Sequence, residues 1–312
     1  MSFQIFKNSI FIFLILLIPF FLTGCKLNLF DKTFSDKDDE IQKELVELVK
    51  KEYGHKIEVK IVNKTIGVYF PVNNLLENDE AKEKKLNEET AKKIDRVIFL
   101  THRVALSSNK KLDFYIVIAT DMKSGYALSI IGYFFDVHRI RLLDISKDEF
   151  SQRLLKGLNK NSEAINDWDG KHFKIEEIFL PNFLAAQIAQ RIKIVASEKK
   201  NDSEKNKFFY SWFQEKKPNE KFEAKEIQWG LKDKIFTFVL EILDYQEKNV
   251  QETFNLILKT TAHVLRAYDF DYNAARIIIK SKNENKKIFF INKKDLELFR
   301  KGKIKIENLI SE

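Results

Sequence analysis

The sequence predicts an α+β protein built from two small modules that share the element order β-α-β-β-α, behind an N-terminal signal helix. Short β-branched runs alternate with segments in which apolar residues recur every three or four positions, which indicates strands and amphipathic helices. The order of these elements is the same in both halves of the chain. The halves therefore represent either a diverged internal repeat or two common α+β layouts that coincide.

The first module opens with a predicted helix over residues 39–53, whose apolar residues form one stripe and which Gly54 ends. Two β-branched runs at 57–62 and 65–70 follow and predict a hairpin. Because proline lacks the N–H that a sheet ladder needs, we expect Pro71 to end the second strand.

A long helix comes next, with an apolar face too broad for a lone surface helix, so we expect it to lie across a sheet. Two strands rich in apolar residues follow, and then two helices, the second of which begins at a Ser146 capping box. In order, these elements are the helix 88–107, the strands 112–120 and 126–133, and the helices 135–143 and 146–158.

The remaining elements start with a helix over residues 182–196, which has Pro181 in its first turn. The second module then repeats the earlier order, with a strand or hairpin, a helix, two strands and a last helix. Their expected ranges are 227–243, 250–266, 275–280, 287–291 and 293–300.

The N-terminus has the pattern of a secretory signal peptide. Lys7 provides a positive charge before an apolar run from Ile10 to Leu22, which is too short to span a bilayer comfortably. The residues Leu22-Thr23-Gly24-Cys25 resemble the lipobox of bacterial lipoproteins. That resemblance implies cleavage before Cys25, acylation of its thiol and a mature protein held outside the cytoplasm. An uncleaved anchor helix with an incidental cysteine is the alternative.

These features divide the chain into five parts. We expect a signal peptide at 1–24, a lipidated tether at 25–40, an N-terminal α+β domain at 41–197, a charged linker at 198–207 and a C-terminal α+β domain at 208–312. Each domain is expected to fold independently. Cys25 is the single cysteine, so disulfides do not stabilise either domain.

Composition narrows the classes of partner. Lys and Arg number 54 against 46 Asp and Glu, giving a net charge of +8 over 312 residues. Since acids and bases alternate along the chain, the surplus is typical of a solvated surface, although contact with an anionic membrane or an acidic glycan is the alternative. No basic stripe with interleaved aromatic residues indicates nucleic acid.

Motifs for nucleotide, acyl-transfer and metal chemistry are absent from the sequence, and we expect neither a cofactor nor a metal. The histidines His102, His263 and His138 are scattered singly, which favours packing or surface roles. One cluster has the residue types of a ligand site, a loop that contains Asp167, Trp168, Asp169 and His172. Indole rings stack on sugars and carboxylates accept hydroxyl donors, so the loop is either a glycan or weak cation site or a solvated turn pinned by a buried tryptophan.

The sequence therefore favours a lipid-anchored envelope protein that acts as a binding or adaptor module and not as an enzyme. Its expected partner is another envelope protein, and its membrane is the cell membrane or the outer membrane. We expect binding through the surface of the N-terminal module, whose apolar hairpin over 112–133 is either central in its sheet or offers an edge for strand addition. The alternative function is that of a glycan-binding protein or hydrolase that uses the loop at 167–172.

The lipobox gives a first prediction. Replacing Cys25→Ala should abolish incorporation of labelled palmitate and either leave the precursor uncleaved or make the protein extractable without detergent, because the acylated thiol is removed. Palmitate labelling that is unchanged by Cys25→Ala would contradict the assignment.

Overall fold

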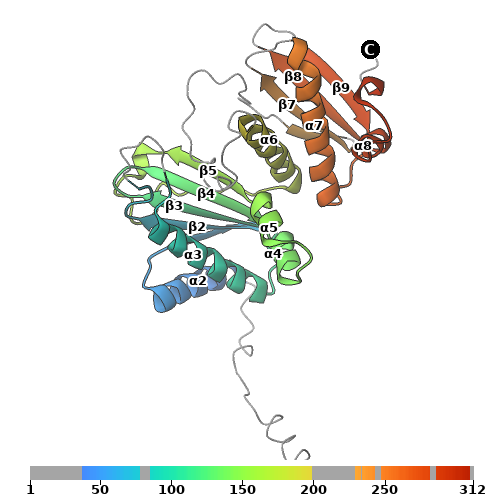
Figure 1. The fold of residues 1–312 in the computed structure, drawn as a ribbon. Helices are drawn as coiled ribbons and strands as arrows, with labels where there is room; N and C mark the ends of the chain where they lie inside the picture. Colours follow the sequence, from blue (N-terminus) through green and yellow to red (C-terminus); the bar gives the residue numbers. More distant parts are fainter. Residues whose placement is uncertain are drawn as a thin grey trace, which may run out of the picture.

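The structure is a computed structural model that describes residues 37–77, 85–198, 229–232, 234–242, 247–281 and 286–309. The predicted signal peptide, Cys25 and most of the predicted linker lie outside these residues. The described chain forms two mixed β-sheets with helices packed against them, which confirms the predicted α+β class (Figure 1).

The first sheet has five strands in the order β1-β2-β3-β4-β5. Neighbouring strands are antiparallel except β2 and β3, which run parallel. Helix α3 lies in the connection between these two parallel strands, which need a long crossover because a tight turn cannot join strands that run in the same direction. The elements of this half are α2 (Asp38–Tyr53), β1 (Glu58–Val62), β2 (Thr65–Val72), α3 (Glu88–Ser107), β3 (Phe114–Asp121), β4 (Tyr126–Tyr133), α4 (Phe134–Arg141), α5 (Lys147–Arg153), β5 (Leu155–Lys160) and η1 (Ser162–Ala164).

The second sheet has four strands in the order β6-β7-β8-β9, again with one parallel pair, β7 and β8. Helix α7 makes the crossover between them. The elements of this half are α6 (Leu180–Glu198), β6 (Trp229–Lys232), β7 (Ile235–Ile242), α7 (Glu247–Ala267), β8 (Ala274–Ser281), β9 (Lys286–Asn292), α8 (Lys293–Arg300) and η3 (Ile306–Asn308).

The two halves agree in register as well as in element order, with β1 to α4 matching β6 to α8. Thr65 lies opposite Phe114, which lies opposite Tyr133, and the same places in the second sheet are taken by Ile235, Ala274 and Asn292. The crossover helices also match, because each carries a buried threonine whose hydroxyl donates to the carbonyl four residues earlier, at 2.8 Å in α3 and 2.7 Å in α7. The repeated order is therefore a property of the fold, and common descent of the halves stays a hypothesis.

Helices α2 and α3 pack against one face of the first sheet and form its main core with apolar side chains of β1 to β4 (Figure 1). Gly54 adopts φ 68° at the end of α2, as its position after the apolar stripe predicted. Long helix α3 begins at the Asn87 cap, and its apolar face lies on the sheet as expected.

The other face of the first sheet is covered as well. Phe173 and Ile175, from the segment after β5, lie over β2, where Gly67 leaves room because a Cβ there would come within 2.6 Å of Ile175. Farther along this face Phe114 of β3 meets Phe183 of α6, with ring centroids 5.3 Å apart. With both faces covered, every residue of β2 is buried.

Pro71 does not end β2, contrary to expectation, and the strand continues through Val72. The Val72 carbonyl accepts the N–H of Met122 at 3.0 Å, so the backbone nitrogen of Pro71 points to the opposite side of the strand. On that side the pairing with β1 reaches only to Tyr69, which lies opposite Glu58, the first residue of β1. The missing N–H therefore leaves no ladder position unfilled.

The helix expected over residues 146–158 is wrong in its second half. Ser146 caps α5 as expected, but the helix ends at Arg153 and residues 155–160 form β5. The backbone of this switch is held from α6, because Gln187 donates to the Arg153 carbonyl and the Gln190 side chain binds the Leu154 carbonyl at 2.9 Å and the Lys156 N–H at 3.1 Å. With β5 at the edge, the hairpin over 112–133 is central in its sheet, the first of its two expected placements.

Helix α6 packs on α7 and on strand β6 of the second sheet, although the sequence assigned it to the N-terminal domain. Its apolar residues belong to a core that also contains Phe114 of the first sheet and Phe236 of the second. Independent folding of the two domains stays a prediction, and this shared core argues against it.

A buried ion pair joins the halves beside α6. The Asp136 carboxylate accepts from Arg153 at 2.7 Å and from the Tyr268 hydroxyl, at the end of α7, at 2.8 Å. Burial raises the pKa of Asp136, and Arg153 and Tyr268 oppose that rise by holding the charged form. Arg153 also binds Glu149 at 2.6 Å, and its guanidinium lies 4.9 Å from the centre of the Tyr268 ring.

Removing one partner of this pair should be costly, because it leaves a buried charge unpaired. We expect Asp136→Ala to lower the free energy of unfolding by about 3–5 kcal/mol, measured by urea denaturation. Asp144→Ala is the matched control, since Asp144 pairs with Arg139 at the surface and its loss should cost less than about 1 kcal/mol. Equal losses in the two variants would show that the buried pair contributes no more to stability than a surface pair.

Candidate functional site

The loop that the sequence singled out folds around Asp167. Its carboxylate accepts the backbone N–H groups of Lys171 and His172, both at 2.8 Å, and lies 3.2 Å from Nδ1 of His172. Both oxygens are thus engaged within the loop. The Asp167 side chain is buried, and it acts as the organising group of the turn.

The same turn is fastened to the first sheet. The Tyr69 hydroxyl of β2 donates to the Asp167 carbonyl at 2.8 Å, and Gly170 sits at φ 66° against the Tyr69 ring, where a Cβ would come within 3.0 Å of a ring carbon. Glycine is required here for both the backbone conformation and the close approach. The loop is therefore a fixed extension of the sheet.

Burial alone would raise the pKa of Asp167, but the N–H groups of His172 and Lys171 outweigh it and hold the pKa below the ordinary carboxyl value. A carboxyl group with a lowered pKa stays ionised and is a poor general acid or base near neutral pH. Chemically, Asp167 is suited to holding the turn.

The side chains of the other three predicted residues do not converge on one point. Asp169 forms an exposed ion pair with Lys56, and His172 is directed at Asp167. Trp168 is 44% exposed, so the turn is pinned by an aspartate and not by a buried tryptophan, as the sequence had suggested. Trp168 is the member of the cluster that presents a broad surface outward.

The histidines are dispersed, as expected. His102 packs edge-on against Tyr115 with ring centroids 4.4 Å apart, and burial together with Arg141 lowers its pKa to about 3, so it is neutral. His138 and His263 are both exposed, which corrects the packing role expected for His263. Within the described ranges, no group of three or more His, Cys, Asp or Glu side chains is placed to hold a metal ion.

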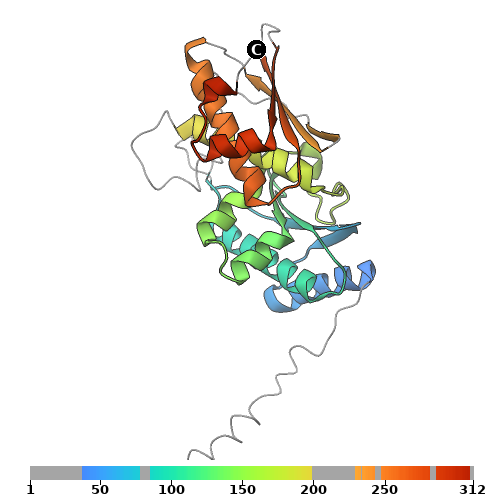
Figure 2. The same cartoon turned by 90° about the vertical axis from the view of Figure 1, so that its right-hand side faces the viewer.

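A different surface stands out on the second sheet. Helices α7 and α8 lie on one face of this sheet (Figure 2). Ile277 and Ile291 are buried in the core on that face, and Phe289 meets Phe254 of α7 there, with ring centroids 3.8 Å apart. Side chains alternate along a strand, so their neighbours face the other way. Ile288 and Phe290, on β9, are 47% and 61% exposed on that opposite face, which we call the open face.

The open face has a defined composition. Register places Ile278 of β8 beside Ile288, and Arg276 of β8 between Phe290 on one side and Thr237 of β7 on the other. Arg276 is exposed, and no carboxylate among the described residues forms an ion pair with it. The open face is thus an apolar surface with a positive charge at its centre.

The corresponding face of the first sheet is not exposed. It is covered by Phe173 and Ile175, and Gly67 makes room for them at the position that Thr237 occupies in the second sheet. The exposed residues of the open face, Ile288 and Phe290, lie on β9, which is an edge strand of the described sheet. Exposed apolar residues on an edge strand are unusual in a monomer and typically mark a contact surface.

Sequence analysis overlooked the open face, although a signal was present. Residues 288–291 read Ile-Phe-Phe-Ile, four apolar residues in succession, whereas a strand with one solvated face alternates apolar and polar residues. Such a run predicts a strand that is apolar on both faces. Helices α7 and α8 cover one of these two faces, and the other is the open face.

Comparison with known proteins adds little. No family model matches the chain, and no curated protein matches its sequence. Among solved structures, it is similar to the C-terminal domain of sex pheromone staph-cAM373 precursor from Staphylococcus aureus, with 10% identity, 74% of this chain covered and a TM-score of 0.18. The chain spans 61% of the length of that structure, and a likeness this weak carries no argument. None of the described helices is long and apolar enough to cross a membrane.

The geometry of the loop predicts that Asp167 contributes to stability and that Asp169 does not. Asp167→Ala should lower the free energy of unfolding by about 1–3 kcal/mol, because two part-buried backbone N–H groups lose a charged acceptor. Asp169→Ala, at the exposed pair with Lys56, should leave the free energy of unfolding almost unchanged, because solvent screens that pair. The Asp167 contribution is present above the ordinary carboxyl pKa and is lost as the pH falls through its lowered value. A difference between the variants that persists unchanged in acid would contradict this role.

Proposed function

We propose that this protein is a lipid-anchored cell-envelope protein that acts as a non-enzymatic binding or adaptor module, and that it contacts its partner through the open face. The observation that carries the proposal is the exposure of Ile288 and Phe290 on an edge strand whose counterpart face in the first sheet is covered. Burial of apolar surface contributes about 25 cal/mol per Å², so covering these side chains favours association.

The chemistry of the open face indicates the kind of partner. Arg276 would be costly to bury without a negative charge, so the contacting segment should bring a carboxylate among apolar side chains. The free edge of β9 offers backbone N–H and C=O groups to an added strand, and that strand would place alternate side chains beside Ile288 and Phe290. The partner that fits is an envelope protein with an extended segment of apolar and acidic residues.

The lipid anchor complements such a role. Acyl chains on Cys25 would hold the protein at a membrane surface and raise its concentration relative to partners in the same envelope. A scaffold of two joined modules then presents a surface while the anchor supplies proximity. Neither task requires a cofactor.

A second candidate is supported by one observation. Trp168 exposes a large part of its indole on the fixed loop, and an exposed indole is a common platform for a sugar ring. Binding of an envelope glycan at this loop is therefore the alternative. It requires Trp168 and does not involve the open face.

Site-specific crosslinking in cells tests the main proposal. A photoreactive phenylalanine analogue at position 290 should yield one discrete adduct with an envelope protein, and the same analogue at Phe99, an exposed phenylalanine of α3, should not. The Arg276→Glu charge reversal should abolish the adduct by repelling the partner's carboxylate. Lys294→Glu, which makes the same change on α8, should leave it intact.

Two results would count against the proposal. One is labelling from position 290 that is no stronger than from position 99. The other is an adduct that survives Arg276→Glu but disappears in Trp168→Ala, which would favour the glycan-dependent alternative.

A further inference from the structure

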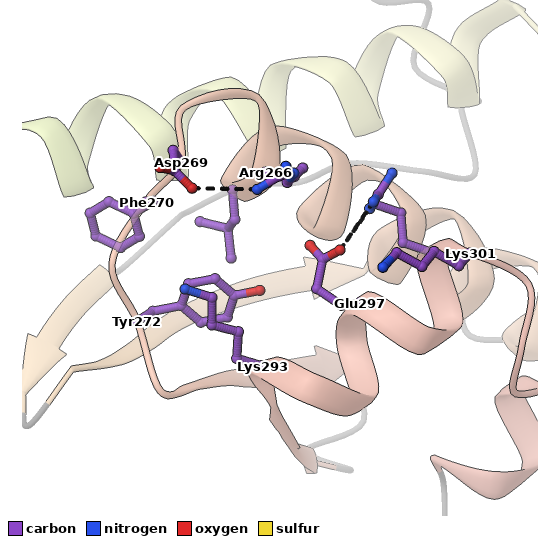
Figure 3. A pocket seen from close by; sticks show the side chains of 9 residues that line it. Arg266, Asp269, Phe270, Tyr272, Lys293, Glu297 and Lys301 are labelled. Carbon is purple, nitrogen blue, oxygen red and sulfur yellow. Dashed lines mark hydrogen bonds and ion pairs between the residues drawn. The ribbon is translucent and has the colours of Figure 1, made fainter.

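A pocket of about 300 Å³ opens between the end of α7, the connection to β8 and helix α8 (Figure 3). This volume lies at the small end of the range for ligand sites. The pocket belongs to the second module and is separate from the open face, because it lies on the helical side of the sheet. Its lining residues are Leu265, Arg266, Asp269, Phe270, Tyr272, Lys293, Glu297, Arg300 and Lys301.

The Tyr272 hydroxyl is directed into this pocket, toward Glu297 (Figure 3). Tyr272 is only 3% exposed, and its hydroxyl has no hydrogen-bond partner in the described part of the chain. Burial raises its pKa to about 12, so the group keeps its proton and remains a donor. A buried donor without an acceptor is unfavourable, and a ligand atom in the pocket would satisfy it.

The charges that surround the hydroxyl are unbalanced. Four lining residues are basic and two are acidic. Arg266 pairs with Asp269 at 3.4 Å and Arg300 with Glu297 at 3.1 Å. Lys293 and Lys301 have no carboxylate within ion-pair distance among the residues described, so the pocket has a positive surplus that attracts anions.

The first module shows that the fold does not need this polarity. Lys293 begins α8 as Phe134 begins α4, and both N–H groups donate to the residue just before the adjoining strand, at 2.8 and 2.9 Å. Tyr272 lies two residues before β8, as Leu112 lies two residues before β3. Leu112 and Phe134 are buried in the first core. The second module thus has a core tyrosine that carries a hydroxyl and an exposed lysine at the two places where the first module has purely apolar core side chains.

We infer that this pocket binds a small anion that also carries hydroxyl groups, such as a sugar phosphate or a sugar acid. The ammonium groups of Lys293 and Lys301 attract its negative charge, and the Tyr272 hydroxyl donates to one of its oxygens. The Glu297 carboxylate, across the pocket, accepts from a ligand hydroxyl. A bare anion would leave Glu297 facing a like charge, so the ligand needs a donor as well. This site extends beyond the adaptor role and does not depend on it.

Calorimetric titration of the full-length protein in detergent tests the inference, with glucose 6-phosphate, glucuronate, inorganic phosphate and glucose as probes. We expect saturable binding of glucose 6-phosphate or glucuronate, weaker binding of phosphate and none of glucose. Which of the two sugar anions binds distinguishes a phosphate from a carboxylate ligand. The inference is overturned if neither sugar anion binds at millimolar concentration, or if glucose binds equally well.

Two variants with internal controls separate binding from folding. Tyr272→Phe and Lys293→Ala should each weaken the sugar anion by about tenfold or more, which corresponds to the loss of one charge-assisted contact. Tyr272→Phe should leave the thermal midpoint unchanged or higher, because it removes a hydroxyl that has no partner in the protein. Lys294→Ala, next to Lys293 but outside the pocket, should leave affinity unchanged. Full affinity in both pocket variants would overturn the inference.

Discussion

The two modules meet around a buried ion pair. Asp136 and Arg153 are brought together by the short helices that follow the first sheet, and Tyr268, from the end of α7, completes the hydrogen bonding of the carboxylate. A buried charge is tolerated only where its partners are fixed. Arg153 comes from the first half and Tyr268 from the second, so the carboxylate links the two, and the contact of Phe114 with Phe183 of α6 adds apolar area nearby.

The joined halves have the same frame but different surfaces. In the first, Phe173 and Ile175 cover the face of the sheet that the helices leave bare, and the turn organised by Asp167 holds that cover in place. In the second, the same face exposes Ile288 and Phe290. A repeated scaffold can therefore use one copy for stability and the other for contact, since a face that is covered in one module is available in the other.

A similar contrast applies to the ends of the crossover helices. Leu112 and Phe134 complete the first core, whereas Tyr272 and Lys293 line a pocket at the corresponding place. The Tyr272 ring is still part of the second core, so the change there adds a hydroxyl without removing an apolar contact, whereas Lys293 is exposed. The polar groups retained in the second module are thus best explained by a ligand and not by the demands of the fold.

The sequence by itself determined the class of the fold, the order of its elements and most of their bounds, because apolar periodicity and capping residues such as Ser146 act within a few positions along the chain. It also located the turn at Asp167. Tertiary structure alone decided the rest. Residues 155–160 form a strand because they pair with β4 along their whole length, while Gln187 and Gln190 of α6 bind the backbone where that strand begins. At the turn, Asp167 is the buried residue and Trp168 the exposed one. Contacts between residues far apart in sequence have no local pattern, so only the assembled chain reveals them.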